Sequence, residues 1–180
     1  MVRAEKNCGI EAAKNFSFGE WRYSSGNILL QTAGLFRKTK AERTNLRSEW
    51  HKEATVVLNN TDILFVDSDN GLIVPSTEGT VKASKYVEPQ ELADYYSQGP
   101  SVIYYQHKAR RNDTFYIEQH KRLLSCPAFD GTTGLGLKFV TTSQRYYFFI
   151  IHPKHKDIIN EQIQQMMNTS WKDHFCLFPL

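Results

Sequence analysis

The sequence predicts an α+β fold in which about seven antiparallel strands are followed by one amphipathic helix. Aromatic residues make up 13% of the 180-residue chain, and aromatic side chains favour the pleated, half-buried surface of a sheet. Short apolar runs are separated by turn residues up to residue 152, after which the apolar period changes from two to about 3.6. Strands and helices do not alternate along the chain, which argues against a parallel α/β enzyme fold.

The first part of the chain is predicted to contain strands joined by polar turns. Gly34 marks a kink or bulge in the first strand, and Asn59–Thr61 suits the tight turn of a hairpin. In chain order the expected elements are a lead-in that is a short helix or flexible (1–25), a first strand (26–39), a charged loop (38–47) and a hairpin (53–58 and 62–67).

The middle of the chain is predicted to combine one short helix with further strands. Pro89 suits the first turn of that helix, and Gly99-Pro100 ends it. The charged residues 108–113 form a turn between two strands. In chain order the expected elements are a weak strand (79–86), the helix (88–96), two strands (101–106 and 114–117), an irregular stretch (120–136) and a last hairpin (137–141 and 145–151).

A C-terminal helix is predicted over residues 153–171, because apolar residues recur there at helical spacing. Ile159, Ile163 and Met167 fall on one face, and Trp171 lies one turn further on. This face is expected to cover the open end of the sheet. The residues that follow are apolar, and they either fold back onto the sheet or dock into a partner.

Bulk properties limit the functions to consider. At 180 residues the chain is long enough for one domain with its own core. No apolar run approaches the ~20 residues that cross a bilayer, and residues 1–15 lack the apolar centre of a signal peptide. Val2 excludes N-myristoylation of the sequence as it stands, since that needs Gly after the initiator Met. A formal net charge of +3 is too small for generic nucleic-acid binding.

Cysteine and histidine spacing gives no sign of a disulfide framework or a metal site. The three cysteines are widely spaced and form no CxxC pair, which fits reduced thiols in a cytoplasmic protein. His152 and His155 lack the carboxylate of an HExxH motif. The Gly-rich residues 130–136 are not followed by the GK[ST] of a phosphate loop. We therefore expect no metal, no cofactor and no catalytic residue.

Three sets of residues resemble the pleckstrin-homology family, and together they span residues 26–172. They are Gly34-x-Phe36-x-Lys38 with Trp50, Ile63-Leu64-Phe65 before an acidic turn, and Tyr146–Ile150 with the helix 153–171. Residues 87–100 and 119–136 are then insertions, and 173–180 is an apolar tail. The resemblance implies a half-open antiparallel barrel plugged by the C-terminal helix. It also implies a pocket for phosphorylated lipid headgroups between the first two strands.

Basic residues gather in the segment that the resemblance assigns to the headgroup pocket. Lysine and arginine there can contact several phosphates, with a contribution on the order of 1 kcal/mol per cation. The predicted lipid-binding residues are Lys38, Lys40, Arg43, Arg47 and Lys52. A second basic patch is predicted at Lys108, Arg110 and Arg111. The alternative for both sets is an ordinary solvated surface. For the lipid-binding set this alternative is supported by Glu42, Glu49 and Glu53, which lie among or beside its basic residues.

The pattern as a whole favours a non-catalytic module that recruits the chain to anionic phospholipid membranes as a peripheral protein. One alternative is a protein-interaction adaptor that uses the insertions and the apolar tail. A further alternative is a metal-independent nuclease or phosphodiesterase. In that case His120 acts as the base and Lys121 stabilises the developing anion, with Tyr116 nearby.

Overall fold

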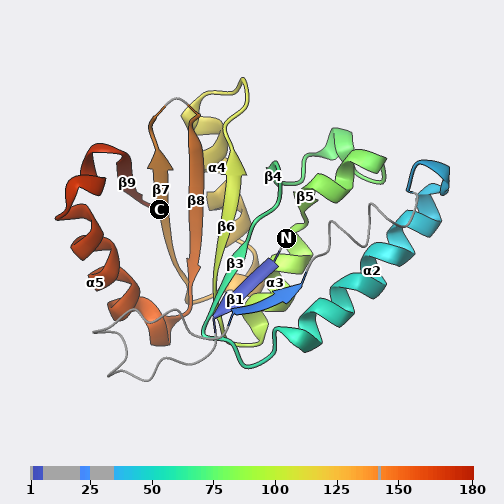
Figure 1. Cartoon of the computed structure of the whole chain (residues 1–180), viewed down its shortest axis with the longest axis horizontal. Coiled ribbons are helices and arrows are strands. Elements are labelled where there is room, and N and C mark those ends of the chain that lie inside the picture. Colours follow the sequence, from blue (N-terminus) through green and yellow to red (C-terminus); the bar gives the residue numbers. More distant parts are fainter. Residues whose placement is uncertain (1, 6–20, 25–34, 142) are drawn as a thin grey trace.

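The computed structural model describes residues 2–5, 21–24, 35–141 and 143–180 (Figure 1). Within these residues the strands are β1 (Val2–Glu5), β2 (Trp21–Ser24), β3 (Ile63–Val66), β4 (Gly71–Leu72), β5 (Tyr86–Val87), β6 (Ser101–His107), β7 (Thr133–Phe139), β8 (Arg145–Ile151) and β9 (Phe175–Pro179). The α-helices are α2 (Lys40–Val57), α3 (Pro89–Ser97), α4 (Asp113–Leu124) and α5 (Lys156–Met167).

One mixed sheet organises the described residues. Its strands lie in the order β2-β1-β3-β6-β8-β7-β9. β3 and β6 are parallel, whereas the other neighbouring pairs of this sheet are antiparallel. β4 and β5 form a separate, parallel pair. Helices cover both faces of the large sheet: α2, α3 and α4 pack on one face and α5 packs on the other (Figure 1).

Alternate residues of the same strand fill the two cores. On β8, Phe148 and Ile150 pack on the side of α2, α3 and α4. Phe149 and Ile151 point the other way and pack with Ile159 of α5. Successive side chains of a strand point to opposite faces, so a strand that is apolar at every position needs a cover on both. The unbroken apolar run of β8 therefore explains why helices lie on both sides.

The α+β class is confirmed, and so are several of its elements. β3, β6, α3 and the β7–β8 hairpin lie within four residues of their predicted bounds, and α5 lies inside the predicted C-terminal helix. Pro89 opens α3, where the N–H that proline lacks is not needed. The weak strand predicted at 79–86 is mostly a 3₁₀ turn, Val81–Lys85, followed by the short β5.

Two predictions for the first part of the chain are wrong. The predicted loop at 38–47 and the predicted strand at 53–58 lie mostly in α2. Thr39 caps this helix: its hydroxyl accepts from the N–H of Glu42, whose carboxylate accepts from the N–H of Thr39. No Gly or Pro follows within α2, so nothing interrupts the helix after this start.

The strand predicted at 114–117 is also wrong, because these residues lie in α4. Asn112 caps that helix by accepting from the N–H of Phe115 at 3.0 Å. Phe115, Tyr116 and Ile117 favour strands when taken alone. The capping bond and the burial of Tyr116 in the core outweigh that preference.

The half-open antiparallel barrel is not confirmed. The sheet of the described residues is open and contains a parallel pair, and a helix replaces the second strand that the resemblance implies. Residues 26–34 of the predicted first strand lie outside the described residues. Leu35–Arg37 form a 3₁₀ turn.

Segments near both ends of the chain join the large sheet. β1 and β2 fall within the predicted lead-in, and β1 pairs with β3. Residues 6–20 of that lead-in lie outside the described residues. β9 falls within the predicted tail and pairs with β7, and its Phe175 and Leu177 pack on the α5 side. The apolar tail therefore folds back onto the sheet.

A buried polar pair joins β6 to α4. The hydroxyl of Tyr104 and Nδ1 of His120 are hydrogen-bonded at 2.9 Å, and the His120 ring stacks on Phe148 with 4.6 Å between ring centroids. His120 is completely buried. Burial disfavours the charged imidazole and lowers the pKa of His120 to about 3.

We predict that His120 makes stability fall as the pH drops from about 6.5 to about 3. Over this range the unfolded chain takes up a proton at His120 and the folded chain does not, so protonation favours unfolding. The expected contribution is about 1.4 kcal/mol per pH unit. Urea unfolding of the wild type and His120→Gln at several pH values measures it, because Gln keeps an acceptor for Tyr104 without titrating.

The matched control is His174→Gln, since His174 is exposed. The control should keep the pH dependence of the wild type, whereas His120→Gln should reduce it. Equal pH dependence in all three proteins would contradict the prediction.

Candidate functional site

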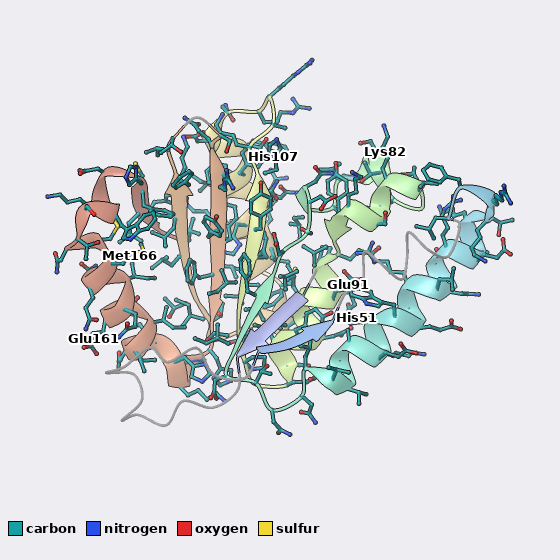
Figure 2. The ribbon with its side chains drawn as sticks, viewed as in Figure 1. His51, Lys82, Glu91, His107, Glu161 and Met166 are labelled. Carbon is teal, nitrogen blue, oxygen red and sulfur yellow. The ribbon has the colours of Figure 1, made fainter. Side chains whose placement is uncertain are left out.

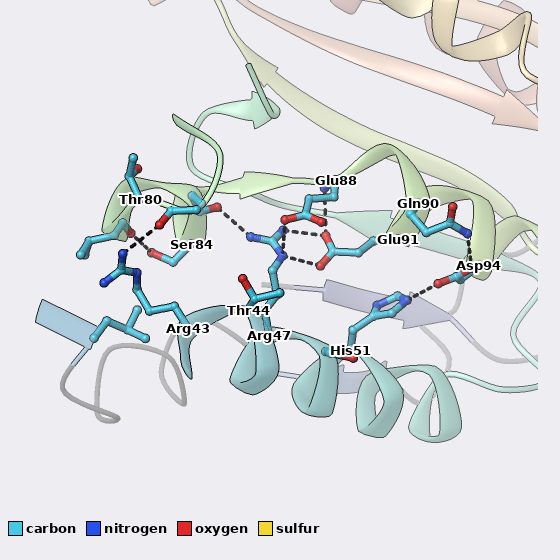
Figure 3. Close-up of a pocket in the computed structure, with 15 residues that line it drawn as sticks. Arg43, Thr44, Arg47, His51, Thr80, Ser84, Glu88, Gln90, Glu91 and Asp94 are labelled. Carbon is cyan, nitrogen blue, oxygen red and sulfur yellow. Dashed lines mark hydrogen bonds and ion pairs between the residues drawn. The ribbon is translucent and has the colours of Figure 1, made fainter. Parts of the chain in front are cut away.

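Helix α2 and the residues just before it carry the predicted basic cluster. Within Lys40–Val57, all of which the structure describes, Ala54 is the only buried residue. Trp50, which is partly buried, also packs on the core, so the apolar contacts of the helix lie in its second half, whereas its first half is held by polar contacts of Arg43 and Arg47. Arg43 and Arg47 lie four residues apart, which places them on the same side of the helix. Both face the segment that runs from Gly79 into α3 (Figure 3).

Arg47 is the centre of an ion-pair network in which Glu91 is buried and Glu88 is partly exposed. Its Nε and Nη2 each donate to a carboxylate oxygen of Glu91 at 2.7 Å, and Nε lies 3.1 Å from Glu88. Nη1 and Nη2 also donate to the carbonyl oxygens of Ala83 and Tyr86, at 2.8 and 2.7 Å. The side chains of Arg47 and Glu91 are 13% and 7% exposed. The donors of Arg47 are thus used inside the protein.

Burial and charge have opposite effects on the ionisation of this network. Burial disfavours the charge of Arg47, but the hydrogen bond with Glu91 and the charges of Glu91 and Glu88 outweigh it and raise the pKa of Arg47. Burial raises the pKa of Glu88, although the charge of Arg47 opposes this. The guanidinium therefore stays charged, and Glu88 holds a proton more readily than an exposed glutamate does.

Arg43 holds residues 79–85 against the start of α2. Its Nη2 donates to the carbonyl oxygen of Gly79 at 2.8 Å, and Nη1 donates to that of Lys38. Gly79 has a φ of +68°, and a Cβ there would meet the side chain of Lys40 at 2.2 Å. Glycine therefore suits the backbone angle, whereas the flexible end of Lys40 could move aside for a Cβ. Nε of Arg43 is buried and has no hydrogen-bond partner among the described residues.

A cavity of about 240 Å³ lies between α2 and the segment from Gly79 into α3 (Figure 3). Arg47 crosses its centre to reach Glu88 and Glu91. Further along, His51 Nε2 lies 2.8 Å from the Asp94 carboxylate. Side-chain hydroxyls complete the polar lining, from Thr44, Ser48, Thr80 and Ser84. Because its arginine and carboxylate charges largely compensate one another, the cavity has no strong preference for an ion of either sign.

The lysines of the predicted cluster do not form one pocket. Lys38 is half-buried, whereas Lys40 and Lys52 are exposed. Lys52 lies twelve residues after Lys40 on the same helix, which is about 18 Å along the axis. The structure therefore brings Lys38 and Lys40 together near the start of α2 and leaves Lys52 apart.

The second predicted patch follows the carboxyl end of β6. Lys108 Nζ lies 3.3 Å from the carbonyl oxygen of Arg111 and 3.6 Å from the carboxylate of Asp113. The guanidinium of Arg111 lies over the ring of Phe115, 5.5 Å from its centre. Arg110 is exposed. These cations stand at the start of α4.

The two predicted basic patches lie along one edge of the molecule. The N–H of His107 donates to the carbonyl oxygen of Asn70, and the N–H of Asn70 donates to that of Lys85. These bonds, with that from Arg43 to Gly79, connect the end of β6 to the start of α2. Figure 2 shows His107 and Lys82 on this side. We name the cations along this edge the basic rim: Arg37, Lys38, Lys40, Lys82, Lys108, Arg110 and Arg111.

The residues of the alternative nuclease are not arranged around a shared cleft. His120 is completely buried and Tyr116 is 3% exposed, so neither meets solvent. The hydroxyl of Tyr116 instead accepts from the N–H of Ala109 at 2.8 Å. In the part of the chain that the structure describes, no group of three His, Cys, Asp or Glu side chains could hold a metal ion.

The partners of Arg47 were not identified from the sequence. Glu88 and Glu91 lie more than forty residues away from it, and nothing in their spacing points to α2. One signal was available: the carboxylate of Glu91 accepts from the N–H of Glu88, which is the capping arrangement that begins α3. That signal locates the helix start but not the arginine that binds there.

Comparison with models of protein families, with characterised proteins and with solved structures finds no match to this chain. Among the described residues, no helix has both the length and the apolar character needed to cross a membrane. The function must therefore be argued from the arrangement of side chains alone.

We predict that Arg47→Ala destabilises the fold by about 3 kcal/mol or more, because it leaves the carboxylate of Glu91 buried without its partner. Arg47→Lys should have a smaller effect, since lysine keeps the charge but not the forked donors. Lys52→Ala on the same helix is the control and should change stability by less than about 0.5 kcal/mol. Urea unfolding compares the three variants, and equal losses for Arg47→Ala and Lys52→Ala would refute the role of the network.

Proposed function

We propose that the chain binds anionic phospholipid membranes as a peripheral protein through the basic rim. The observation that carries this proposal is that both basic patches lie along one edge, although residues 38 and 108 are seventy positions apart in the sequence. Cations spread along one edge can meet a flat anionic surface at the same time, with about 1 kcal/mol from each.

Two of the acidic residues beside the rim, Glu42 and Asp113, are engaged in contacts with neighbouring groups, which supports the proposal. The carboxylate of Glu42 accepts from the N–H and the hydroxyl of Thr39, at 2.7 and 2.8 Å. The carboxylate of Asp113 accepts from Lys138 and from the hydroxyl of Tyr146, at 2.5 and 2.7 Å. The hydrogen bonds from Lys138 and Tyr146 outweigh burial and lower the pKa of Asp113. Both carboxylates thus have partners that compete with the rim cations.

Two exposed aromatic side chains favour a membrane over a nucleic-acid duplex. Phe36 is 89% exposed and Phe115 is 39% exposed, and each lies beside rim cations. An apolar ring flanked by cations gains by entering the boundary between headgroups and acyl chains. A nucleic-acid duplex offers mainly phosphates at its surface. The formal net charge of +3 also gives little general attraction to nucleic acid.

The proposed contact set differs from the set expected from the sequence. It keeps Lys38 and Lys40 and the second patch, and it omits Arg43, Arg47 and Lys52. Arg43 and Arg47 donate to internal acceptors, and Lys52 lies far along α2. The pleckstrin-homology resemblance remains a prediction, and the proposal does not depend on it.

We predict that Lys38→Ala/Lys40→Ala weakens binding to vesicles of phosphatidylcholine and phosphatidylserine about thirtyfold at low salt, since two cations are lost. Arg110→Ala/Arg111→Ala should have a similar effect, and Phe36→Ser should weaken binding without changing its salt dependence. Lys52→Ala is the matched control on the same helix and should bind like the wild type. Vesicle co-sedimentation over a range of salt concentrations measures these changes.

A parallel titration with a single-stranded and a double-stranded oligonucleotide distinguishes the two kinds of polyanion. Failure of the wild type to sediment with anionic vesicles would reject the membrane proposal. Oligonucleotide binding that depends on the same rim residues would then assign the edge to nucleic acid.

A further inference from the structure

β9 forms one edge of the large sheet. It pairs with β7, and no other strand of the described residues lies beside it. Both faces of β9 are packed: Phe175 and Leu177 contact the core on the α5 side, and Phe178 contacts the core on the α4 side. The strand contains no charged residue, although charged side chains commonly protect an open sheet edge. β9 is thus a short apolar edge without charged side chains, and the one protective residue it contains is Pro179 near its end.

The hydrogen-bond pattern shows which backbone groups of β9 face outward. The N–H of Val140 donates to the carbonyl oxygen of His174 at 2.9 Å, and Phe139 lies opposite Phe175. In an antiparallel ladder, hydrogen-bonded and non-hydrogen-bonded pairs alternate. The backbone N–H and C=O of Cys176 therefore form hydrogen bonds with β7, whereas those of Phe175 and Leu177 face away from β7.

Pro179 supports this assignment independently. It falls in the outward-facing set with Phe175 and Leu177, at the position opposite Leu135. Proline has no N–H to donate, so it is tolerated in a strand where the N–H does not contribute to the ladder. The free edge of β9 therefore offers the N–H and C=O of two residues, with Cys176 between them.

We propose that β9 pairs with β9 of a second copy of this chain, antiparallel and centred on Cys176. The outward-facing backbone N–H and C=O groups of Phe175 and Leu177 are arranged symmetrically about Cys176. A second copy related by a two-fold axis next to Cys176 therefore presents matching donors and acceptors to this edge. Phe175 of each copy then exchanges both backbone hydrogen bonds with Leu177 of the other. An isologous contact of this kind closes after two subunits, as in most symmetric dimers.

The pairing brings the two Cys176 residues directly opposite each other. They form a non-hydrogen-bonded pair, for which the Cα atoms lie about 4.5 Å apart, and this is close enough for a disulfide. Cys176 is exposed in the single chain. An added oxidant should therefore join the two thiols, taking two electrons while two protons are released. The proposal goes beyond membrane binding and does not depend on it.

Sedimentation equilibrium of the full chain in reducing buffer tests the pairing. Wild type and Cys176→Ser should form a dimer, whereas Cys176→Lys should raise the dimer dissociation constant at least tenfold, because two like charges then face each other. Cys126→Lys places the same charge at another exposed cysteine and is the control. It should dimerise like the wild type.

Oxidation with copper phenanthroline gives a second readout on the same pairing. In a background of Cys8→Ser and Cys126→Ser, the remaining Cys176 should yield a covalent dimer on a non-reducing gel. A variant with Cys126 as its sole cysteine should yield far less. The proposal is overturned if the wild type is monomeric at high micromolar concentration, or if crosslinking through Cys126 is as fast as through Cys176. A monomeric protein would mean that the β9 edge is available to pair with an extended peptide of another protein instead.

Discussion

The position of α2 depends on a buried ion pair. Ala54 alone is fully buried within this eighteen-residue helix, all of which the structure describes, and Trp50 packs on the core one turn before it, so the apolar contacts of α2 lie in its second half. Arg47 instead joins the helix to Glu91 and Glu88 and to the backbone at Ala83 and Tyr86. Separating two buried, oppositely charged side chains costs much free energy, because each charge is then left without water and without its partner. The basic end of α2 and residues 79–85 are therefore fixed relative to the sheet by polar contacts.

The sequence predicted the second half of the chain better than the first, for a physical reason. β6 and β8 are rich in aromatic and β-branched residues, and their pattern does not depend on distant partners. α2 contributes Trp50 and Ala54 to the core, which is too few apolar residues for a periodic stripe, so a search for periodic apolar residues overlooks it. The pair Thr39 and Glu42 was the local signal for its start. Which cations turn inward could not be predicted, since that depends on Glu88 and Glu91, far along the chain.

Two features of the sheet explain where the proposed contacts lie. Because β3 and β6 are parallel, their carboxyl ends lie at the same end of the sheet. There the turn after β3 contacts residues 79–85, and α4 begins shortly after β6. Loops at such ends are free to carry side chains for binding, because the strands and helices behind them supply stability. The edge strand β9 lies at the opposite side of the sheet from α2 (Figure 1). Membrane contact and pairing of two copies thus use different surfaces and are compatible.

The strand order also constrains how the protein is made. β7 leaves the ribosome before β8, yet β8 lies between β7 and β6 in the sheet. β7 therefore has no place in the sheet until residues 145–151 have emerged, and the outer edge of β6 stays open for the same period. Exposed apolar strands of this kind are prone to aggregate during synthesis. The risk of aggregation is therefore greatest between the emergence of β7 and that of β8.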